Sequence, residues 1–198
     1  MTEPRWIALL LFPDVTEMDA IGPWEVLAQW TKGFPEDGWG IYCVSPDGKP
    51  VTCSKGLTIE PHYGMSDMPA PEIFIHPGGM GTRPMLNDQE HLDWIRDLRS
   101  TVPLMASVCT GALVYAKAGL LSGRPATTHW ASIELLGELD PTIDVRPDER
   151  FVDDGDVVSS AGVSAGIDMA LHLVRRFAGV ERARQVRKRI QYDPEPPV

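Results

Sequence analysis

The 198-residue sequence predicts an α/β fold, a three-layer sandwich in which helices cover both faces of a mostly parallel sheet. The expected strands are continuous apolar runs rather than alternating ones, which is typical of strands buried on both faces. These runs alternate with segments of helical periodicity, as they do in parallel sheets. Because no internal repeat or linker interrupts the pattern, we expect one domain over residues 1–198, with a proline-rich surface tail over about 192–198.

The N-terminal half begins with an apolar strand that ends at Pro13-Asp14. Gly22-Pro23 is expected to open the following helix, because proline suits the first helical turn. Later strands end at two strong turn signals, Pro46-Asp47-Gly48 and Pro77-Gly78-Gly79. The strands expected in this half, two of which could form a β-ribbon, lie at residues 6–12, 39–45, 51–53, 57–61 and 72–76.

The C-terminal half continues the alternation of strands and helices. Asn87-Asp88 can cap the first helix, whose apolar residues recur every three positions and face the core. Gly119 is expected to end the next helix. The remaining strands and extended pieces are expected at residues 103–108, 126–128, 144–146, 150–152 and 157–160, and the helices at 110–116, 130–139 and 164–177.

Cys109 is the most informative residue, because it lies between an apolar strand and a helix with small residues in its first turn. A residue on such a sharp strand-to-helix turn projects from the carboxyl edge of the sheet, which is the geometry of a nucleophile elbow. The helix N-terminus is expected to lower the pKa of a thiol placed there. A buried structural cysteine is the alternative interpretation, since free cysteines often pack as small apolar residues.

Other candidate site residues follow neighbouring strands, where a parallel sheet places its functional groups. Asp19 is expected on the loop after the first strand, where its carboxylate could reach Cys109 or could simply compensate a helix dipole. Glu17 is a rival acid nearby. The backbone N–H groups of Gly78 and Gly79 could form an oxyanion-type hole with the N–H after Cys109, although a plain turn is the alternative. His129 follows a pair of threonines and is either a pocket residue or a structural hydrogen-bonding group.

Composition narrows the class of protein. A formal net charge of −10 argues against a nucleic-acid surface, and the basic stretch from Arg182 to Arg189 is interpreted as an exposed helix face. We expect no signal peptide and no membrane span. The three cysteines, Cys43, Cys53 and Cys109, lack metal-type spacing and favour a reducing, cytoplasmic setting, with a Cys43–Cys53 disulfide as a minor alternative. No phosphate loop, dinucleotide fingerprint or metal cluster is recognisable, so we expect neither a metal nor a cofactor.

The motifs together resemble the ThiJ/PfpI superfamily, whose flavodoxin-like sandwich is similar to class I glutamine amidotransferases. The resemblance covers nearly the whole chain. The separation of 20 residues between Cys109 and His129 (129 − 109) is also similar to the superfamily pattern. The segments that carry it are Asp19-Ala20-Ile21-Gly22-Pro23, His76-Pro77-Gly78-Gly79, Ser107-Val108-Cys109-Thr110-Gly111, Ala126-Thr127-Thr128-His129-Trp130, residues 161–168 and residues 191–197.

Within the superfamily, the motifs around Cys109, His129 and Asp19 are most similar to the isonitrile hydratase branch. They also occur in the sensor domains of arabinose-type transcription regulators, whose C-terminal helix-turn-helix has no counterpart in this sequence. The protease-like branch has histidine directly after the cysteine. Thr110 occupies that position here, so peptidase activity is not expected.

The hydratase resemblance implies a mechanism with a small-molecule substrate. The Cys109 thiolate would attack an isonitrile carbon to give a covalent thioimidate. Asp19, with a raised pKa, would supply a proton and then activate the water that releases an N-substituted formamide. Thr110 would orient that water through its hydroxyl, while its N–H and that of Gly79 polarise the intermediate. His129 would support the pocket, and its apolar wall would consist of Ile21, Trp24 and Trp130.

Two other functions remain open from the sequence. The same cysteine and acid could act on reactive carbonyls, as in a glyoxalase or deglycase. Alternatively, Cys109 could serve a redox or ligand sensor without turnover. The resemblance further implies a homodimer.

Overall fold

The computed structural model describes residues 4–194 and confirms the predicted α/β fold. Seven strands form the central sheet in the order β10-β11-β7-β6-β1-β2-β5. All neighbouring pairs are parallel except β10 and β11. The strands are β1 (Arg5–Leu10), β2 (Trp39–Ser45), β5 (Tyr63–Gly64), β6 (Ile73–His76), β7 (Leu104–Val108), β10 (Phe151–Asp153) and β11 (Val157–Ser160).

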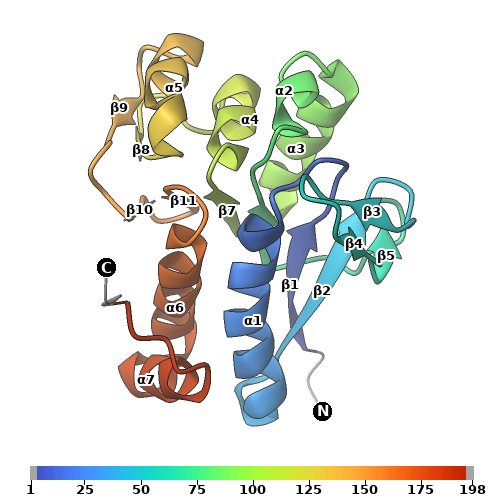
Figure 1. Cartoon of the computed structure of the whole chain (residues 1–198), viewed down its shortest axis with the longest axis vertical. Helices are drawn as coiled ribbons and strands as arrows, with labels where there is room; N and C mark the ends of the chain where they lie inside the picture. Colours follow the sequence, from blue (N-terminus) through green and yellow to red (C-terminus); the bar gives the residue numbers. More distant parts are fainter. Residues whose placement is uncertain (1–3, 195–198) are drawn as a thin grey trace.

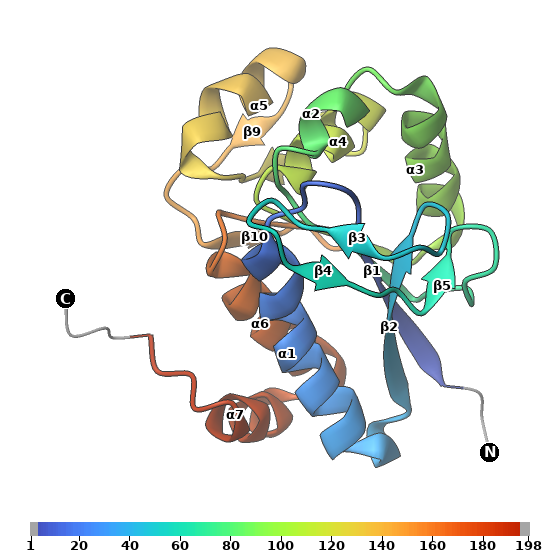
Figure 2. The same ribbon diagram turned by 45° about the vertical axis from the view of Figure 1, so that its right-hand side comes forward.

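Helices cover both faces of this sheet (Figures 1 and 2). The long helices α1 and α6 pack side by side, and α7 crosses their ends; α2, α3, α4 and α5 form a second packed group. The helices are α1 (Glu17–Gly33), α2 (Thr82–Met85), α3 (Gln89–Thr101), α4 (Gly111–Ala118), α5 (Ile133–Leu139), α6 (Ala165–Ala178) and α7 (Val180–Arg189), with short 3₁₀ turns at Pro35–Asp37 and Trp130–Ser132.

The first helix corrects the sequence prediction, because α1 begins at Glu17 rather than at Gly22-Pro23. Asp19 therefore lies in the first helical turn and not on a preceding loop. Pro23 is tolerated inside the helix near its start. Because proline has no backbone N–H, its one consequence for the helical hydrogen bonds is that the Asp19 carbonyl receives none from residue 23. Gly22 permits close packing of α6, since a Cβ at Gly22 would be 3.2 Å from Cγ1 of Ile167.

Most other predicted elements are confirmed within a few residues. The ribbon forms as the antiparallel pair β3 (Val51–Thr52) and β4 (Thr58–Ile59). Asp88 caps α3 by accepting a hydrogen bond from the backbone N of His91 at 3.1 Å, and Gly119 ends α4 with a φ of 86°. A further parallel pair joins β8 (Pro125–Ala126) and β9 (Asp144–Val145). The sequence pattern does not predict β5 and α2, which span two and four residues and are too short to show a periodicity.

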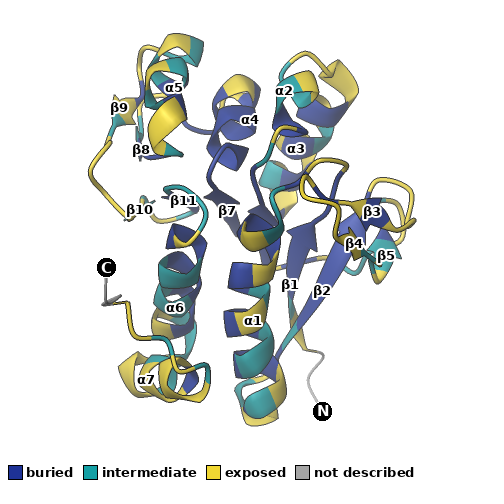
Figure 3. Cartoon of the chain, in the orientation of Figure 1, coloured by how far each residue is buried: buried dark blue, intermediate teal, exposed yellow. Residues whose placement is uncertain are grey.

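The interior is apolar along the strands, whereas the outer faces of the helices are exposed (Figure 3). The order of the strands reverses at β1, which places β2 on one side of β1 and β6, β7 and β11 on the other. The loops after β1 and β6 meet at this point, where Thr16 N donates to Gly78 O at 2.9 Å. In open parallel sheets such a switch point is where ligands bind.

Candidate active site

Cys109 occupies the sharp turn between β7 and α4, as the sequence predicts. Its φ of 56° is a left-handed conformation that non-glycine residues rarely adopt. The neighbouring strand supports this turn, because Cys109 N donates to the carbonyls of Ser160 and Ala161 at 3.1 and 3.2 Å. Thr128 adds a hydrogen bond from its hydroxyl to Cys109 O at 2.7 Å. The tertiary structure thus holds a strained residue in place, as is common at functional sites.

The Pro77-Gly78-Gly79 loop lies between Asp19 and the elbow. Gly78 N donates to Oδ2 of Asp19 at 3.1 Å. A Cβ at Gly78 would lie 2.5 Å from Thr110 N and 2.8 Å from Oδ2 of Asp19. Only glycine therefore allows the elbow and the acid to approach the loop this closely.

Asp19 is completely buried and faces the Cys109 thiol. Burial raises the pKa of Asp19 from 3.8 to about 6, although the hydrogen bonds with Cys109 and with Gly78 N and the charge of Lys55 pull it down. Among residues 4–194, no N–H or O–H group donates to Oδ1 of Asp19. A buried carboxyl with an unsatisfied oxygen and a raised pKa is suited to exchanging a proton with its neighbour.

The pKa of Cys109 contradicts the sequence prediction of a lowered value. Burial and the charge of Asp19 raise the pKa of the thiol to about 12. The backbone N–H groups of Thr110 and Val163 face the sulfur and oppose this shift, but they do not outweigh it. Cys109 is only 5% exposed, so loss of hydration penalises the thiolate more than the helix N-terminus favours it. In the resting site the proton therefore stays on sulfur.

Thr110 ties the elbow to the glycine loop. Its Oγ1 accepts hydrogen bonds from Gly79 N at 2.9 Å and from Oγ1 of Thr82 at 3.1 Å. The N–H groups of Gly78 and Gly79, predicted as oxyanion donors, are thus directed to Asp19 and Thr110 in this state. The N–H groups that do face the sulfur belong to Thr110 and Val163.

Val163 and Thr82 were not anticipated from the sequence. Val163 has a φ of 50°, which is unfavourable for a β-branched residue and turns its N–H toward Cys109. It follows β11, the neighbour of β7, so the rule that sites gather at strand carboxyl ends could have indicated it. For Thr82 no sequence signal was available, because it lies in a helix of four residues.

The remaining predicted site residues differ in how close they lie to Cys109 and Asp19. His129 packs on the Val163 loop, since a Cβ at Gly162 would be 2.4 Å from its Cδ2. Ile21 and Trp24 line a cavity of about 260 Å³ together with Cys43 and His62, and neither Cys109 nor Asp19 lines this cavity. Trp130 is 79% exposed. The structure thus brings together Cys109, Asp19, Thr110, Gly78 and Gly79, with His129 beside them, but not the predicted apolar wall.

Glu17, the rival acid, is engaged elsewhere. It accepts hydrogen bonds from Lys55 N at 2.6 Å and from the Ser54 hydroxyl at 3.1 Å. Burial acts upward on its pKa, but these bonds and its own backbone N–H lower the pKa to about 2. Glu17 therefore stays ionised and holds the β3–β4 turn, which leaves Asp19 as the acid at Cys109.

Other sequence expectations can be compared with the described residues. Cys43, Cys53 and Cys109 are free thiols, so the alternative disulfide does not form. Within residues 4–194, no group of three or more histidine, cysteine or acidic side chains is arranged to hold a metal ion. In the same range, no helix is long and apolar enough to cross a membrane. The Arg182–Arg189 stretch lies in the largely exposed helix α7, as expected.

Comparison with known proteins places this geometry in a family. The profile of the DJ-1/PfpI family matches residues 5–176, and the chain belongs to that family. An isonitrile hydratase from Pseudomonas putida is 40% identical over 192 residues, which are 96% of this chain and 80% of that protein. A crystal structure of a ThiJ/PfpI family protein from Pseudomonas syringae has a TM-score of 0.86 and 31% identity, covering 98% of this chain and 78% of that one.

A regulator is also similar. The HTH-type transcriptional regulator CdhR of Pseudomonas aeruginosa is 30% identical over 190 residues, or 94% of this chain. This chain spans about half the length of the regulator, since the match covers 54% of it. The comparisons confirm the family and the fold that the sequence motifs indicate.

Proposed function

We propose that this protein is a cysteine-dependent isonitrile hydratase, which converts an isonitrile and water to an N-substituted formamide. The observation that supports this most directly is the buried pair of a protonated Cys109 thiol and the Asp19 carboxyl. The pKa of Asp19, about 6, lies near neutrality, so this carboxyl can both accept and return a proton. The 40% identity with an isonitrile hydratase supports the choice of substrate.

In the first step, Asp19 takes the thiol proton as the sulfur of Cys109 attacks the terminal carbon of R–N≡C. The C–S bond forms, and Asp19 returns the same proton to that carbon. The product is a thioimidate, Cys109–S–CH=N–R, and no oxidant or reductant is consumed. The N–H groups of Thr110 and Val163 stabilise the negative charge that develops on sulfur.

In the second step, the Asp19 carboxylate accepts a proton from a water molecule that adds to the thioimidate carbon, and it passes this proton to the nitrogen. The C–S bond of the tetrahedral intermediate, Cys109–S–CH(OH)–NH–R, then breaks. The hydroxyl proton moves to sulfur, which releases R–NH–CHO and restores the thiol. The Thr110 hydroxyl is held by Gly79 N and Thr82, so orienting this water requires it to exchange one of these contacts. Gly78 and Gly79 shape the pocket floor, and His129 supports the Val163 loop.

The apolar substituent of the substrate has to be enclosed by side chains beyond this polar cluster. We propose that Ile21, Trp24 and Trp130 contribute once a homodimer has formed, because Met18 and Ile21 on α1 and Trp130 are exposed apolar side chains. Size-exclusion chromatography with light scattering tests this, and a monomer at micromolar concentration would contradict it. The three free thiols support a reducing, cytoplasmic location.

The activity test uses cyclohexyl isocyanide and follows formation of N-cyclohexylformamide by mass spectrometry. We expect turnover by the wild-type protein and a loss of at least about 10³-fold in Cys109→Ala, because the covalent step is removed. Cys53→Ala, which removes another buried thiol and does not touch the cavity of Ile21 and Trp24, is the matched control and should retain most activity. No turnover with several isonitriles would reject the hydratase proposal.

Two further outcomes separate the alternatives. Consumption of methylglyoxal without isonitrile turnover would favour a glyoxalase or deglycase at the same cysteine. Oxidation of Cys109 under mild peroxide without turnover of either substrate would favour a sensor. The raised pKa of the Cys109 thiol argues against fast oxidation, since thiolates react with peroxide and thiols do not.

A further inference from the structure

A buried pair of histidines lies beneath the glycine loop and takes no part in the chemistry described above. His76 is the last residue of β6 and is fully buried, between the rings of Phe12 and Tyr115 at centroid distances of 5.4 and 5.8 Å. Its Nδ1 is 2.8 Å from Pro77 O, and its Nε2 is 3.3 Å from Nε2 of His91. His91 lies in the first turn of α3.

The partners of His76 fix its protonation. A carbonyl oxygen only accepts hydrogen bonds, so Nδ1 of His76 carries the proton and donates to Pro77 O. Burial and the neighbouring His91 lower the pKa of His76 to about 3, which keeps the ring neutral. Nε2 of His76 is therefore an acceptor, and Nε2 of His91 must donate to it. The ring is held on both sides in a single orientation.

The carbonyl that His76 holds belongs to the same peptide unit as Gly78 N–H. This peptide is trans, like all those described, so its C=O and N–H point in opposite directions. Its carbonyl end accepts from His76, and its N–H end donates to Oδ2 of Asp19 at 3.1 Å. One rigid plane thus connects the buried histidine to the proposed proton carrier.

We propose that His76 is a positioning residue for Asp19, acting through the Pro77–Gly78 peptide, with His91 holding the His76 ring in register. This inference rests on the proposed role of Asp19 in proton transfer, but it concerns the carboxyl itself and can be tested without turnover. If the carbonyl end of the peptide is released, the plane can rotate and the N–H no longer stabilises the Asp19 carboxylate. The pKa of Asp19 must then rise.

Asp19 and His76 have different titratable and charged neighbours. Those that act on Asp19 are Cys109 and Lys55, and those beside His76 are His91 and Tyr115. A substitution at His76 changes none of the groups that act directly on Asp19. A shift in the pKa of Asp19 would therefore be transmitted through the loop.

The test compares three variants of His76. His76→Leu removes both hydrogen bonds. His76→Asn keeps the hydrogen bond to Pro77 O, because its amide nitrogen lies where Nδ1 was. His76→Gln keeps the contact with His91 instead, because its amide nitrogen lies near the position of Nε2. The pKa of Asp19 is measured by ¹³C NMR titration of carboxyl-labelled aspartate in the full chain, with Asp19→Asn used to assign the signal. Tyr115→Phe is the matched control, since Tyr115 is also buried and donates to a backbone carbonyl, Ala106 O.

We expect the pKa of Asp19 to rise by about one pH unit in His76→Leu and His76→Gln, and to stay near the wild-type value in His76→Asn and Tyr115→Phe. The acidic limb of the kcat/KM profile should move by the same amount where turnover is present. Equal shifts in all four variants, or no shift in His76→Leu, would overturn the proposal. If the wild type does not turn over isonitriles, the NMR result still decides the role of His76, and only the hydratase proposal fails.

Discussion

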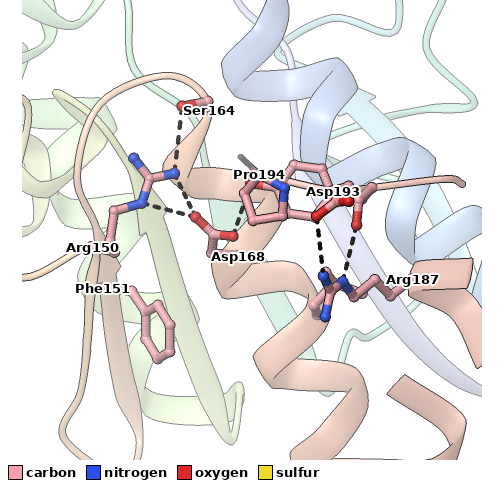
Figure 4. Close-up of a pocket in the computed structure, with 9 residues that line it drawn as sticks. Arg150, Phe151, Ser164, Asp168, Arg187, Asp193 and Pro194 are labelled. Atoms are coloured by element: carbon pink, nitrogen blue, oxygen red, sulfur yellow. Dashed lines mark hydrogen bonds and ion pairs between the residues drawn. The ribbon is translucent and has the colours of Figure 1, made fainter. Parts of the chain in front are cut away.

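Two regions of this molecule are rich in polar and charged groups, but their physical consequences differ. Around Cys109 the polar groups are buried, and Cys109 and Val163 have left-handed backbone conformations. Along α6 they are numerous and open to solvent, around a surface hollow of about 880 Å³ (Figure 4). There Arg150 pairs with Asp168 and Ser164, while Arg187 pairs with Asp193.

Neither Cys109 nor Asp19 lines the surface hollow. Its arginines and aspartates neutralise each other in contact with water, where ion pairs contribute little to stability. At the elbow, a carboxyl and a thiol share a space from which water is excluded, and both pKa values are displaced as a result. Burial of titratable groups, rather than the volume of the hollow, is therefore the property that distinguishes the proposed site.

The largest effect that this comparison predicts is at Asp19. Asp19→Asn should lower kcat/KM for an isonitrile by about 10²- to 10⁴-fold, because proton transfer is lost. In the wild type, kcat/KM should rise with pH through about 6, since Asp19 must be ionised to accept the thiol proton. A pH–rate profile of both proteins measures this. A profile without an acidic limb near pH 6 would contradict the assignment.

The same substitution should raise the free energy of unfolding, an effect that is not expected when an exposed aspartate is replaced. The pKa of Asp19 is raised on folding from 3.8 to about 6, so its ionisation destabilises the folded state as pH rises through that window. The penalty is complete above pH 6 and corresponds to about 2 to 3 kcal/mol. Asp19→Asn should therefore unfold at higher urea concentration at pH 7 but close to the wild-type value at pH 4. Equal shifts at both pH values would be the contrary result.

A smaller effect is expected at Gly111, where α4 begins directly beneath the elbow. A Cβ there would lie 2.1 Å from His76 O and 2.9 Å from Pro77 O, so Gly111→Ala forces the helix away from the loop. We expect about 1 to 3 kcal/mol of destabilisation together with loss of activity. Gly137→Ala in α5 is the control, because its Cβ would meet only Cγ2 of Val145, at 3.8 Å. Urea denaturation should show this control to be neutral or slightly stabilised.

The smallest effect should come from the surface network. Tyr192 donates to Oδ1 of Asp168 at 2.9 Å and joins the described part of the tail to α6. Tyr192→Phe removes this partly buried hydrogen bond, so we expect a loss of about 1 kcal/mol and unchanged kcat/KM. A loss of activity comparable to that of Asp19→Asn would show that the two regions are coupled. Thermal unfolding and the formamide assay measure both quantities.

The sequence predicted the fold where its signals are strong and local. Apolar runs identified β1, β2, β6 and β7, and the strand-to-helix transition identified the elbow at Cys109. The residues from 195 to 198 of the expected tail lie outside the described range, whereas Tyr192 packs on α6. The sequence prediction misplaced the start of α1, because Gly22-Pro23 is a common opening of a helix. These two residues lie inside α1 instead, where Gly22 allows α6 to pack closely.

By itself, the sequence determined the order of strands and helices and the elbow, because each depends on residues adjacent in the chain. It left Asp19 and Glu17 as rival acids, which only their contacts in the folded chain distinguish. Only the tertiary structure decided the protonation of the site. Segments that follow β1, β6, β7 and β11 converge there, and their packing buries Cys109 away from the water that would otherwise stabilise a thiolate. The pKa of a side chain depends on everything packed around it, and no local pattern of residues encodes that packing.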